Sequence, residues 1–336
     1  METIHINYAD GGYDISVGRG LLSSLSGLIN LDRRVIIVTD DGVPVEYAET
    51  VKRQARDAKI VTVGAGEGSK SPETYSALCQ EMLDYGLTRS DAVVAVGGGV
   101  VGDLTGFAAA TYMRGIDFYN VPTTLLSQVD SSIGGKTAIN LGGVKNIVGA
   151  FYRPKAVVID PSVLSTLAPR QIANGLAESI KMALTSDREL FELFERENPL
   201  DMLETVIIRS LMIKKSVVEA DERESSLRKI LNFGHTLGHG IEAEEEMRGL
   251  LHGECVALGM IPMCSPSVRK RLIPVLLGAG LPVEYGYNLD RTLAFTLHDK
   301  KCSAGAVDAV FVEEVGSFVI KKMPLGEWQE YIKASL

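Results

Sequence analysis

The stretch DAVVAVGGGVVGDLTGFAAATY, residues 91–112, passes from a run of valines through three consecutive glycines into an alanine-rich apolar segment. This pattern predicts a buried strand that turns directly into a helix. Glycines at such a turn let backbone N–H groups approach a phosphate at the positive end of the helix, because no Cβ intervenes. Gly97, Gly99 and Gly102 also match the dinucleotide-binding pattern GxGxxG. A tight strand–helix turn without a ligand fits the same residues, so both interpretations stay open here.

Apolar runs on both sides of this turn alternate with helical patterns, such as SPETYSALCQEMLDYG at 71–86. Strands that are apolar throughout and separated by helices are typical of a parallel sheet covered on both faces. The first half of the chain is therefore predicted to be an α/β, Rossmann-like domain. Its expected strands are residues 33–40, 59–66, 91–98, 116–122 and 155–160.

After residue 160 the pattern changes to an apolar period of about 3.6, with few strand signals until VDAVFVEEVGSFVIKKM near the C-terminus. A chain of 336 residues is also long for a single hydrophobic core. We therefore predict an α/β domain over 1–160 and a mainly α-helical domain over 161–336. A crevice between the two halves is the expected ligand site.

Composition and charge limit the possible partners. The formal net charge of −9 leaves no basic excess to neutralise phosphates, which argues against nucleic-acid binding. No apolar stretch approaches the ~20 residues that cross a membrane, and the N-terminus lacks the pattern of a signal peptide. Four separated cysteines without a CxxC pair indicate reduced, buried thiols. We expect a cytoplasmic protein with a small-molecule substrate.

Short polar turns follow several of the expected strands. Asp40 closes one strand, where a carboxylate can accept hydrogen bonds from a ribose. GEGSK at 66–70 is a second glycine-rich turn, and Thr123 and Thr124 follow another strand. Each turn alone is also explained as an ordinary loop. Together they predict a dinucleotide at the carboxyl edge of the sheet.

The segment VPTTLLSQVDSSIGGKTAINLGGVKN, residues 121–146, is rich in hydroxyl groups, glycines and lysines. The ammonium groups of Lys136 and Lys145 among these residues predict an anion pocket. Asp130 is a candidate to hold a nicotinamide carboxamide or a substrate hydroxyl. A solvated hairpin or loop without a function is the alternative.

Three of the five histidines of the chain, His235, His239 and His252, lie close together in LNFGHTLGHGIE and LLHGECVALG. His235 and His239 share a helix face at spacing i, i+4, which nominates them as ligands of a divalent metal. A carboxylate must come from elsewhere, and Glu178 and Glu254 are the candidates. The HExxH pattern of zinc peptidases is absent. Imidazoles on an ordinary helix surface, satisfied by solvent, are the alternative.

Six segments, in this order, resemble the 3-dehydroquinate synthase family, and the resemblance runs from about residue 33 to residue 302. They are GGGVVGDLTGFAAATYMRG, VPTTLLSQVDSSIGGKTAIN, KNIVGAFYRPKAVVID, GLAESIK, LNFGHTLGHGIE and LHGECVALGM. The resemblance implies a dehydroquinate synthase-like fold and a phosphorus–oxygen lyase of the shikimate pathway of aromatic amino-acid biosynthesis. The implied reaction converts 3-deoxy-D-arabino-heptulosonate 7-phosphate to 3-dehydroquinate and phosphate. It proceeds by transient NAD-dependent oxidation, phosphate elimination, reduction and intramolecular aldol closure.

The resemblance also assigns roles to matching positions. It places the metal, Zn²⁺ or Co²⁺, on Glu178, His235 and His252, so that His252 replaces the His239 of the spacing argument. It places NAD on Asp40, Glu67, Lys70, Gly98, Gly99, Val100, Asp103, Thr123, Thr124, Asp130, Lys136 and Lys145. It places the sugar phosphate on Lys136, Asn146, Lys181, Lys214, Arg228, Asn232, His239 and either Lys300 or Lys301. Arg114 would reach a substrate phosphate across the interface of a homodimer.

Other proteins of this fold are the alternatives. A polyol dehydrogenase such as glycerol dehydrogenase would need no lysine cluster for a phosphate. A non-catalytic NAD-binding protein would need no intact metal set. Among sugar-phosphate cyclases, inosose and valiolone synthases are the nearest rivals. One departure from the family pattern is Gly42, where an asparagine is frequent.

Overall fold

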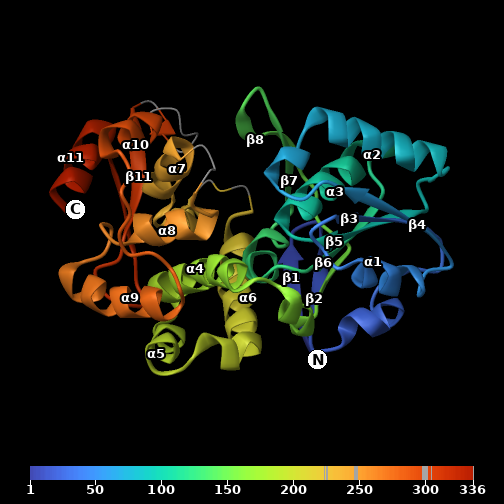
Figure 1. Cartoon of the computed structure of the whole chain (residues 1–336), viewed down its shortest axis with the longest axis horizontal. Helices are drawn as coiled ribbons and strands as arrows, with labels where there is room; N and C mark the ends of the chain where they lie inside the picture. Colours follow the sequence, from blue (N-terminus) through green and yellow to red (C-terminus); the bar gives the residue numbers. More distant parts are fainter. Residues whose placement is uncertain (223, 225, 246–248, 297–301, 304, 336) are drawn as a thin grey trace. The chain divides into compact units, whose positions relative to one another are not determined.

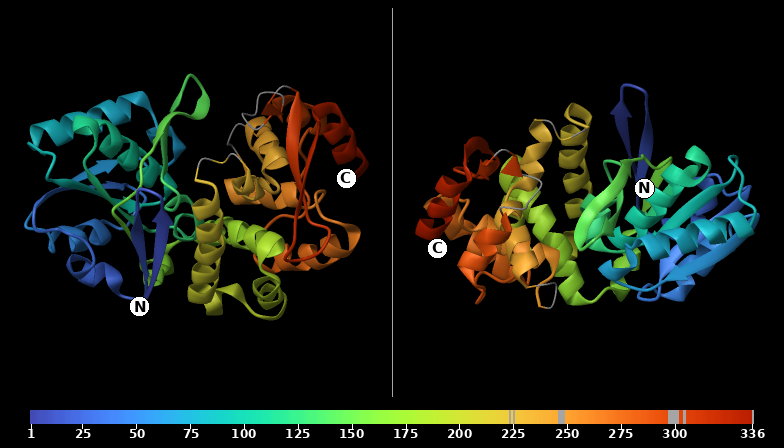
Figure 2. Two further views of the ribbon diagram at one scale, coloured as in Figure 1. Left: turned by 180° about the vertical axis from the view of Figure 1, so that it is seen from behind. Right: turned by 90° about the horizontal axis from the view of Figure 1, so that it is seen from above.

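The computed structural model describes every residue except 223, 225, 246–248, 297–301, 304 and 336. Two compact units, Met1–Leu167 and Ala168–Leu336, make up the chain (Figure 1; Figure 2). The boundary lies a few residues beyond Asp160, the position expected from the sequence. The Asp160 carboxylate accepts hydrogen bonds from the backbone N–H groups of Gly20 and Ser162, each 3.0 Å long. These bonds hold the turn after Asp160 in the first unit.

The sheet of the first unit has the order β1-β2-β9-β6-β5-β3-β4, and every neighbouring pair is parallel except β1 and β2. Its strands are β1 (Glu2–Tyr8), β2 (Gly11–Val17), β3 (Arg34–Asp40), β4 (Asp57–Val63), β5 (Ala92–Gly97), β6 (Asp117–Pro122) and β9 (Ala156–Ile159). The predicted parallel sheet is therefore confirmed, with its expected strands at β3 to β6 and β9. The β1–β2 hairpin at the edge was not predicted. In β1 only Ile4 and Ile6 are buried, the alternation of a strand covered on one face.

Helices cover both faces of this sheet (Figure 1). They are η1 (Leu21–Gly27), α1 (Val45–Lys52), α2 (Pro72–Asp84) and α3 (Gly99–Thr111). Val35 and Ile37 of β3 pack with η1 and α1, whereas Ile36 and Val38 pack with α2 and α3. All four are fully buried, so the middle of the strand is apolar on both sides, as expected of a sheet covered on both faces.

Two further strands of the first unit, β7 (Lys136–Leu141) and β8 (Val144–Phe151), form a hairpin. A hairpin was one of the alternatives that the sequence left open. Gly142 and Gly143 turn the chain with φ values of 60° and 78°, which favour glycine. The hairpin packs against the α3 side of the sheet through Ile139 and Val148. Its tip is the green segment that extends beyond the sheet in Figure 2.

The second unit is mainly helical, as predicted. Its helices are α4 (Pro169–Ser186), α5 (Arg188–Arg196), α6 (Leu203–Ala220), α7 (His235–Glu244), α8 (His252–Met260), α9 (Pro266–Gly278), α10 (Leu289–Phe295) and α11 (Leu325–Ser335). A small antiparallel sheet contains β10 (Cys302–Ser303), β11 (Ala306–Phe311) and β12 (Val319–Pro324). Within the described part of the chain, no helix combines the length and hydropathy needed to cross a bilayer.

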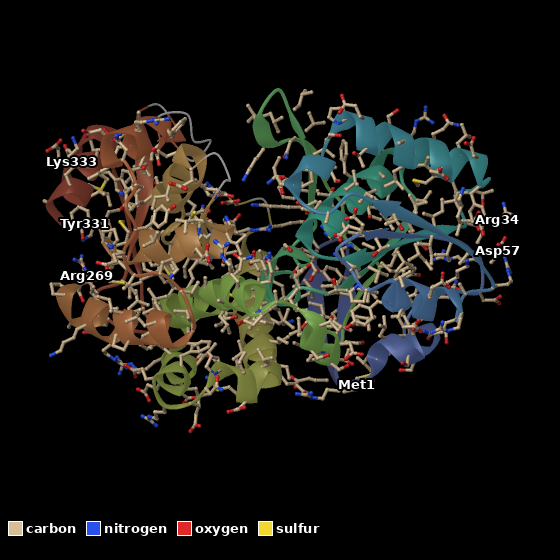
Figure 3. The ribbon with its side chains drawn as sticks, in the orientation of Figure 1. Met1, Arg34, Asp57, Arg269, Tyr331 and Lys333 are labelled. Carbon is tan, nitrogen blue, oxygen red and sulfur yellow. The ribbon has the colours of Figure 1, made fainter. Side chains whose placement is uncertain are left out.

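The two edges of the first unit's sheet carry different groups at the strand ends. Arg34 and Asp57 begin β3 and β4, and their side chains meet at 3.2 Å on the right of Figure 3. The carboxyl ends, at Asp40, Gly97 and Pro122, lie at the opposite edge, because neighbouring parallel strands run in the same direction. The polar turns predicted to bind a dinucleotide come directly after these carboxyl ends, where ligands bind in open α/β sheets.

Candidate metal centre and cofactor-binding edge

Three helices of the second unit bring together one carboxylate and two imidazoles. Glu178 lies in the middle of α4, and His235 and His252 are the first residues of α7 and α8. The Nε2 atoms of the two histidines lie 3.5 Å and 3.6 Å from Glu178 Oε1. Ligand atoms around a tetrahedral zinc ion lie ~3.3 Å apart, given bonds of about 2.0–2.1 Å. The spacing of this group therefore fits a divalent ion.

A glycine allows α8 to approach α4 closely enough for this group to form. A Cβ on Gly253 would lie 2.1 Å from the backbone oxygen of Asn174, far inside a normal contact. Gly253 N–H instead donates to Asn174 Oδ1 over 2.6 Å. Asn174 lies one turn before Glu178, and Gly253 directly follows His252, so this contact sets the separation of two metal-ligand candidates.

Hydrogen bonds at Nδ1 orient both imidazoles. His235 Nδ1 lies 3.1 Å from the carbonyl oxygen of Phe233, and His252 Nδ1 lies 3.3 Å from Glu242 Oε2. A carbonyl or carboxylate oxygen can only accept, so Nδ1 carries the proton in each ring. Nε2 of each ring then faces Glu178 and is the nitrogen available to a metal ion. Metal-bound histidines commonly use such an arrangement, with a carboxylate or carbonyl behind the ring.

The charges around His252 favour a cation. Burial acts to lower the pKa of His252, but hydrogen bonds and charge interactions with Glu178 and Glu242 outweigh it and raise the pKa to about 9. Two carboxylates thus stabilise positive charge at this position. A divalent ion would replace the proton and satisfy the same negative potential.

Glu254, the other carboxylate candidate, has a structural task instead. Its two oxygens accept from Arg170 Nε and from a terminal guanidinium nitrogen of the same side chain, each over 2.7 Å. It also accepts from Leu251 N–H at the start of α8. Burial acts to raise the pKa of Glu254, but these bonds outweigh it and hold the pKa below its usual value.

His239 lies beside the metal-ligand candidates, one turn along α7 from His235. Its ring centroid is 5.4 Å from that of His235 and 5.8 Å from that of His252. A ring nitrogen of His239 lies close to ligand atoms of Glu242 and His252, whereas the group around Glu178 contains His235 and His252. The i, i+4 spacing correctly put two histidines on one face. The second imidazole next to Glu178 nevertheless comes from α8, as the resemblance implied.

Basic side chains with little exposure lie on the elements packed around α4. Lys181 contacts the Glu178 carboxylate and donates to Leu231 O over 2.7 Å. Lys214 on α6 and Arg228 on η7 (Leu227–Asn232) are also buried, and both elements pack against α4. These three buried side chains bring positive charge to this part of the second unit, and positive charge in a partly desolvated site suits an anion.

Asn232 and Glu224 adjoin this region. Asn232 Nδ2 donates to Glu224 Oε1 over 2.7 Å, and Glu224 has a φ of 61°, in the left-handed region. Glu224 was missed by sequence reasoning, because the polar run DERESS has no periodicity. A carboxylate on an uncommon backbone conformation, bonded to a predicted substrate residue, is a signal that only the fold supplies. Lys300 and its alternative Lys301 lie outside the described residues.

In the first unit, the glycine turn lies at the carboxyl edge of the sheet. β5 ends at Gly97, Gly98 caps α3, and α3 begins at Gly99. A Cβ on Gly99 would lie 2.9 Å from Ser131 Oγ. A side chain at position 99 would therefore need the Ser131 side chain to shift. The first turn of α3, which includes Val100, has no acidic residue, so its backbone N–H groups suit an anion such as a pyrophosphate.

Other predicted cofactor residues lie in the turns after β3 and β6. Asp40 Oδ1 accepts from Gly42 N–H over 2.9 Å. Thr123 N–H donates to Gly97 O over 2.9 Å, which joins the turn after β6 to the glycine turn. Thr124 Oγ1 accepts from Ser127 N–H at the start of the π-helical turn η4 (Ser127–Ser131), which contains Asp130. Single π-turns occur frequently at functional sites.

A polar network joins the turn 66–70 to α3 and the hairpin. The Lys70 side chain is only 4% exposed, and its Nζ lies 2.6 Å from Asp103 Oδ2 and 3.8 Å from Glu67 Oε1. Lys70 Nζ also donates to Asn146 Oδ1. The structure therefore brings three predicted cofactor residues together with a predicted substrate residue.

The remaining candidates of the first unit are more exposed. Lys136 begins β7 and is exposed, and Lys145 is half-buried on β8. Arg114 is exposed in η3 (Tyr112–Arg114), with a φ of 66°. Arg114 comes after the carboxyl end of α3, whereas the glycine turn lies at the amino end of the same helix. The fold of the first unit thus does not bring Arg114 to the carboxyl edge of the sheet.

Comparison with known proteins places these features in a family. The N-terminal model of 3-dehydroquinate synthase matches residues 60–174, and the C-terminal model matches residues 175–302. The 3-dehydroquinate synthases of Streptococcus sanguinis and Streptococcus thermophilus are 41% and 38% identical, over 98% of this chain and 99% of each relative.

Solved structures show the same similarity. A 2-deoxy-scyllo-inosose synthase with carbaglucose-6-phosphate, NAD⁺ and Co²⁺ superposes with a TM-score of 0.89 at 29% identity, over 100% of both chains. The 2-epi-5-epi-valiolone synthase of Streptomyces hygroscopicus, with NAD⁺ and Zn²⁺, gives 0.86 at 28% identity, over 96% of this chain and 95% of that one. A probable glycerol dehydrogenase of Sinorhizobium meliloti gives 0.62 at 16% identity over 96% and 95%, and shares only the fold.

Proposed function

This chain belongs to the 3-dehydroquinate synthase family, and we propose on that basis that it converts 3-deoxy-D-arabino-heptulosonate 7-phosphate to 3-dehydroquinate and phosphate. This reaction belongs to the shikimate pathway and is that of a phosphorus–oxygen lyase. The observation that carries the proposal is the group formed by buried Glu178 and His235 with half-buried His252, with Lys181 in contact with its carboxylate. A divalent-ion site beside a buried ammonium group suits a substrate that carries hydroxyls and a phosphate.

Two bound groups belong to this proposal: NAD at the carboxyl edge of the first unit, and Zn²⁺ or Co²⁺ at Glu178, His235 and His252. When bound, the ion stabilises oxyanions at neutral pH, and the nicotinamide takes up and returns hydride, so the net redox change is zero. The inosose and valiolone synthase structures, which hold NAD⁺ with Co²⁺ or Zn²⁺, support both assignments.

The chain's own residues bind and orient the substrate. Loss of phosphate leaves a dianion whose charge must be matched while the C–O bond breaks. Lys181, Lys214 and Arg228 present cationic groups that are already desolvated, so little reorganisation accompanies the reaction. Lys136 and Asn146 have the corresponding binding role in the first unit, and Asn232 and Lys300 complete the assigned set.

His239 is assigned to move a proton. Imidazole is the side chain best suited to accept and return a proton near neutral pH. The His239 ring lies next to two metal-ligand candidates without joining the group around Glu178. An imidazole in this position can exchange a proton with a substrate hydroxyl while the metal ligands stay deprotonated.

We extend the proposal to a cytoplasmic homodimer in which Arg114 reaches the substrate phosphate of the other subunit. Arg114 is exposed and lies after the carboxyl end of α3. Both features support a role away from the carboxyl edge of the sheet in its own subunit. Arg114→Ala should raise the KM for the sugar phosphate at least about tenfold, because a charged hydrogen bond is lost. An unchanged KM, or a monomer by sedimentation, would contradict this extension alone.

Phosphate release is the decisive test of the function. The pure chain with the heptulosonate phosphate, NAD and Zn²⁺ should release phosphate without accumulating NADH. EDTA should stop the release, and added Zn²⁺ should restore it. NADH accumulation without phosphate release would contradict the proposal and favour a polyol dehydrogenase. Glucose 6-phosphate is the matched control, and its turnover in place of the heptulosonate would favour an inosose synthase.

A further inference from the structure

Asn140, in the β7–β8 hairpin, is a polar residue to which none of the roles above assigns a task. We propose that Asn140 is a positioning residue that holds Asn146 in place and joins the hairpin to the turn Glu67–Lys70. Through it, the cofactor side of the first unit sets the geometry of the substrate-contacting hairpin. The inference rests on the proposed function, because it takes Glu67 and Lys70 as cofactor residues and Asn146 as a substrate residue.

The strand register of the hairpin changes at Asn140. The regular pairing breaks between Ile139 and Leu141, and Asn140 alone stands opposite residues 145–147 of β8. Such a bulge leaves backbone groups without ladder partners and redirects side chains, and bulges are frequent next to active sites. Asn140 N–H accordingly donates outside the hairpin, to Lys70 O, over 2.7 Å.

The Asn140 side chain makes two further contacts. Its Oδ1 accepts from Asn146 N–H over 2.8 Å, and its Nδ2 donates to Glu67 Oε1 over 2.9 Å. One residue therefore contacts both ends of the turn Glu67–Lys70 and the bulge opposite. The amide provides both the acceptor for Asn146 N–H and the donor to Glu67, whereas an ionised carboxylate of the same shape has no N–H group to donate.

Asn146 depends on this contact for its conformation. Its φ of 52° lies in the left-handed region, which residues other than glycine adopt rarely and asparagine more readily than most of them. The bond from Asn146 N–H to Asn140 favours this conformation and aims the Asn146 side chain at Lys70 Nζ. Lys70 Nζ also contacts Asp103 at 2.6 Å. A shift of Glu67 or Lys70 when a cofactor binds is thereby transmitted to Asn146.

Steady-state kinetics at saturating NAD test this inference. Asn140→Ala should raise the KM for the heptulosonate phosphate about tenfold, the effect of losing one or two hydrogen bonds, while kcat changes less. NAD affinity without substrate, measured by calorimetry, should change less than the KM. A general loss of folding would instead lower the kcat, the NAD affinity and the urea midpoint together.

Exchanging the amide of Asn140 with the carboxylate of Glu67 distinguishes a positioning role from a merely structural one. Asn140→Asp keeps the acceptor for Asn146 N–H but sets a second carboxylate against Glu67, so the KM should rise as in Asn140→Ala. Adding Glu67→Gln restores the hydrogen bond with donor and acceptor exchanged. The Glu67→Gln single variant measures any effect of Glu67 itself, because its amide oxygen can still accept from Asn140. At saturating NAD, the double variant should have a KM close to that of Glu67→Gln and below that of Asn140→Asp. Val144→Ala is the matched control, since Val144 lies at the tip of the same hairpin with 47% exposure.

An unchanged KM in Asn140→Ala would overturn the inference, as would a double variant no better than Asn140→Asp. Either result leaves the proposed function intact if the wild-type chain releases phosphate. A wild-type chain that releases no phosphate overturns the proposed function and this inference with it.

Discussion

The two units present their functional side chains from different kinds of backbone. In the second unit, Glu178 lies inside a helix, and His235 and His252 begin two others. In the first unit, the predicted cofactor residues lie mainly in turns after strands and are joined by hydrogen bonds such as that of Lys70 to Asp103. Helix packing fixes the metal-ligand candidates before any ligand arrives, whereas polar contacts hold the cofactor edge. We therefore expect the loss of a metal-ligand candidate in the second unit to have an all-or-none effect, and changes at the cofactor edge of the first unit to have graded effects.

The largest effect should follow removal of an imidazole. His252→Ala should abolish zinc binding and lower phosphate release by at least about 1000-fold, because the remaining carboxylate and single histidine no longer hold the ion. Bound zinc is measured by atomic absorption after dialysis. His5→Ala is the control, since His5 is exposed and pairs with Asp14 in the other unit. If His252→Ala retained zinc at full stoichiometry, His252 would not be a ligand and the proposed metal centre would be wrong.

A packing change should test how far zinc binding depends on the close approach of α8 to α4 when the ligand residues themselves are unchanged. Gly253→Ala places a Cβ against the backbone oxygen of Asn174, so it should lower the free energy of unfolding by about 2–4 kcal/mol and weaken zinc binding. Urea unfolding and zinc titration measure the two effects. Gly278→Ala is the control, because a Cβ there meets nothing within 4 Å. Wild-type stability in Gly253→Ala would show that α8 tolerates displacement from α4.

The carboxylate behind His252 should have an intermediate effect. Glu242→Gln keeps the shape of the side chain but removes the charge that orients the imidazole, so zinc affinity should fall about 10–100-fold. Competition with a chromogenic chelator measures this affinity independently of activity. Glu244→Gln, on the same helix, should leave the zinc affinity unchanged. Equal affinities in the two variants would argue that packing alone orients His252.

The first unit should respond more weakly at its glycine turn. Gly99→Ala directs a Cβ at Ser131 Oγ and should lower NAD affinity about tenfold, roughly the loss of one good backbone hydrogen bond. Calorimetric titration with NAD measures the change. Combining it with Ser131→Gly removes the clash and should restore most of the affinity. If the double variant binds as poorly as Gly99→Ala, the clash is not the cause.

The smallest effect should come from Arg170, which orders the start of α8. The Arg170 side chain is 55% exposed, so Arg170→Ala should cost only about 0.5–1 kcal/mol near neutral pH. The pKa of Glu254 is lowered in the folded protein, so the pair stabilises above the unfolded pKa of about 4.3 and loses this effect as pH falls below it. Urea unfolding of wild type and variant should therefore converge in acid. If the free energies of unfolding of wild type and variant still differed in acid, the stabilisation by Arg170 would come from packing rather than charge.

Much of the fold was predictable because its signals are local. Buried parallel strands are apolar throughout, and amphipathic helices repeat their apolar positions, so both leave a pattern in a short window. The β1–β2 hairpin has no such signal beyond a short alternation, and the hairpin at 136–151 is hidden by glycines and polar residues. For Glu224, the informative features are its φ and its bond to Asn232, which no window contains.

The sequence by itself determined that strands alternate with helices in the first half, that helices dominate the second, and that three histidines cluster near one another. Residue spacing left Glu178 and Glu254 as equal candidates, the family resemblance favoured Glu178, and the tertiary structure shows how the imidazoles meet that carboxylate. Glu178 and Glu254 are both glutamates in apolar helices, yet Arg170 binds one, while the close approach of α8 to α4 brings the other to the imidazoles. Periodicity is a property of one segment, but the distance between ligand atoms depends on how several segments pack.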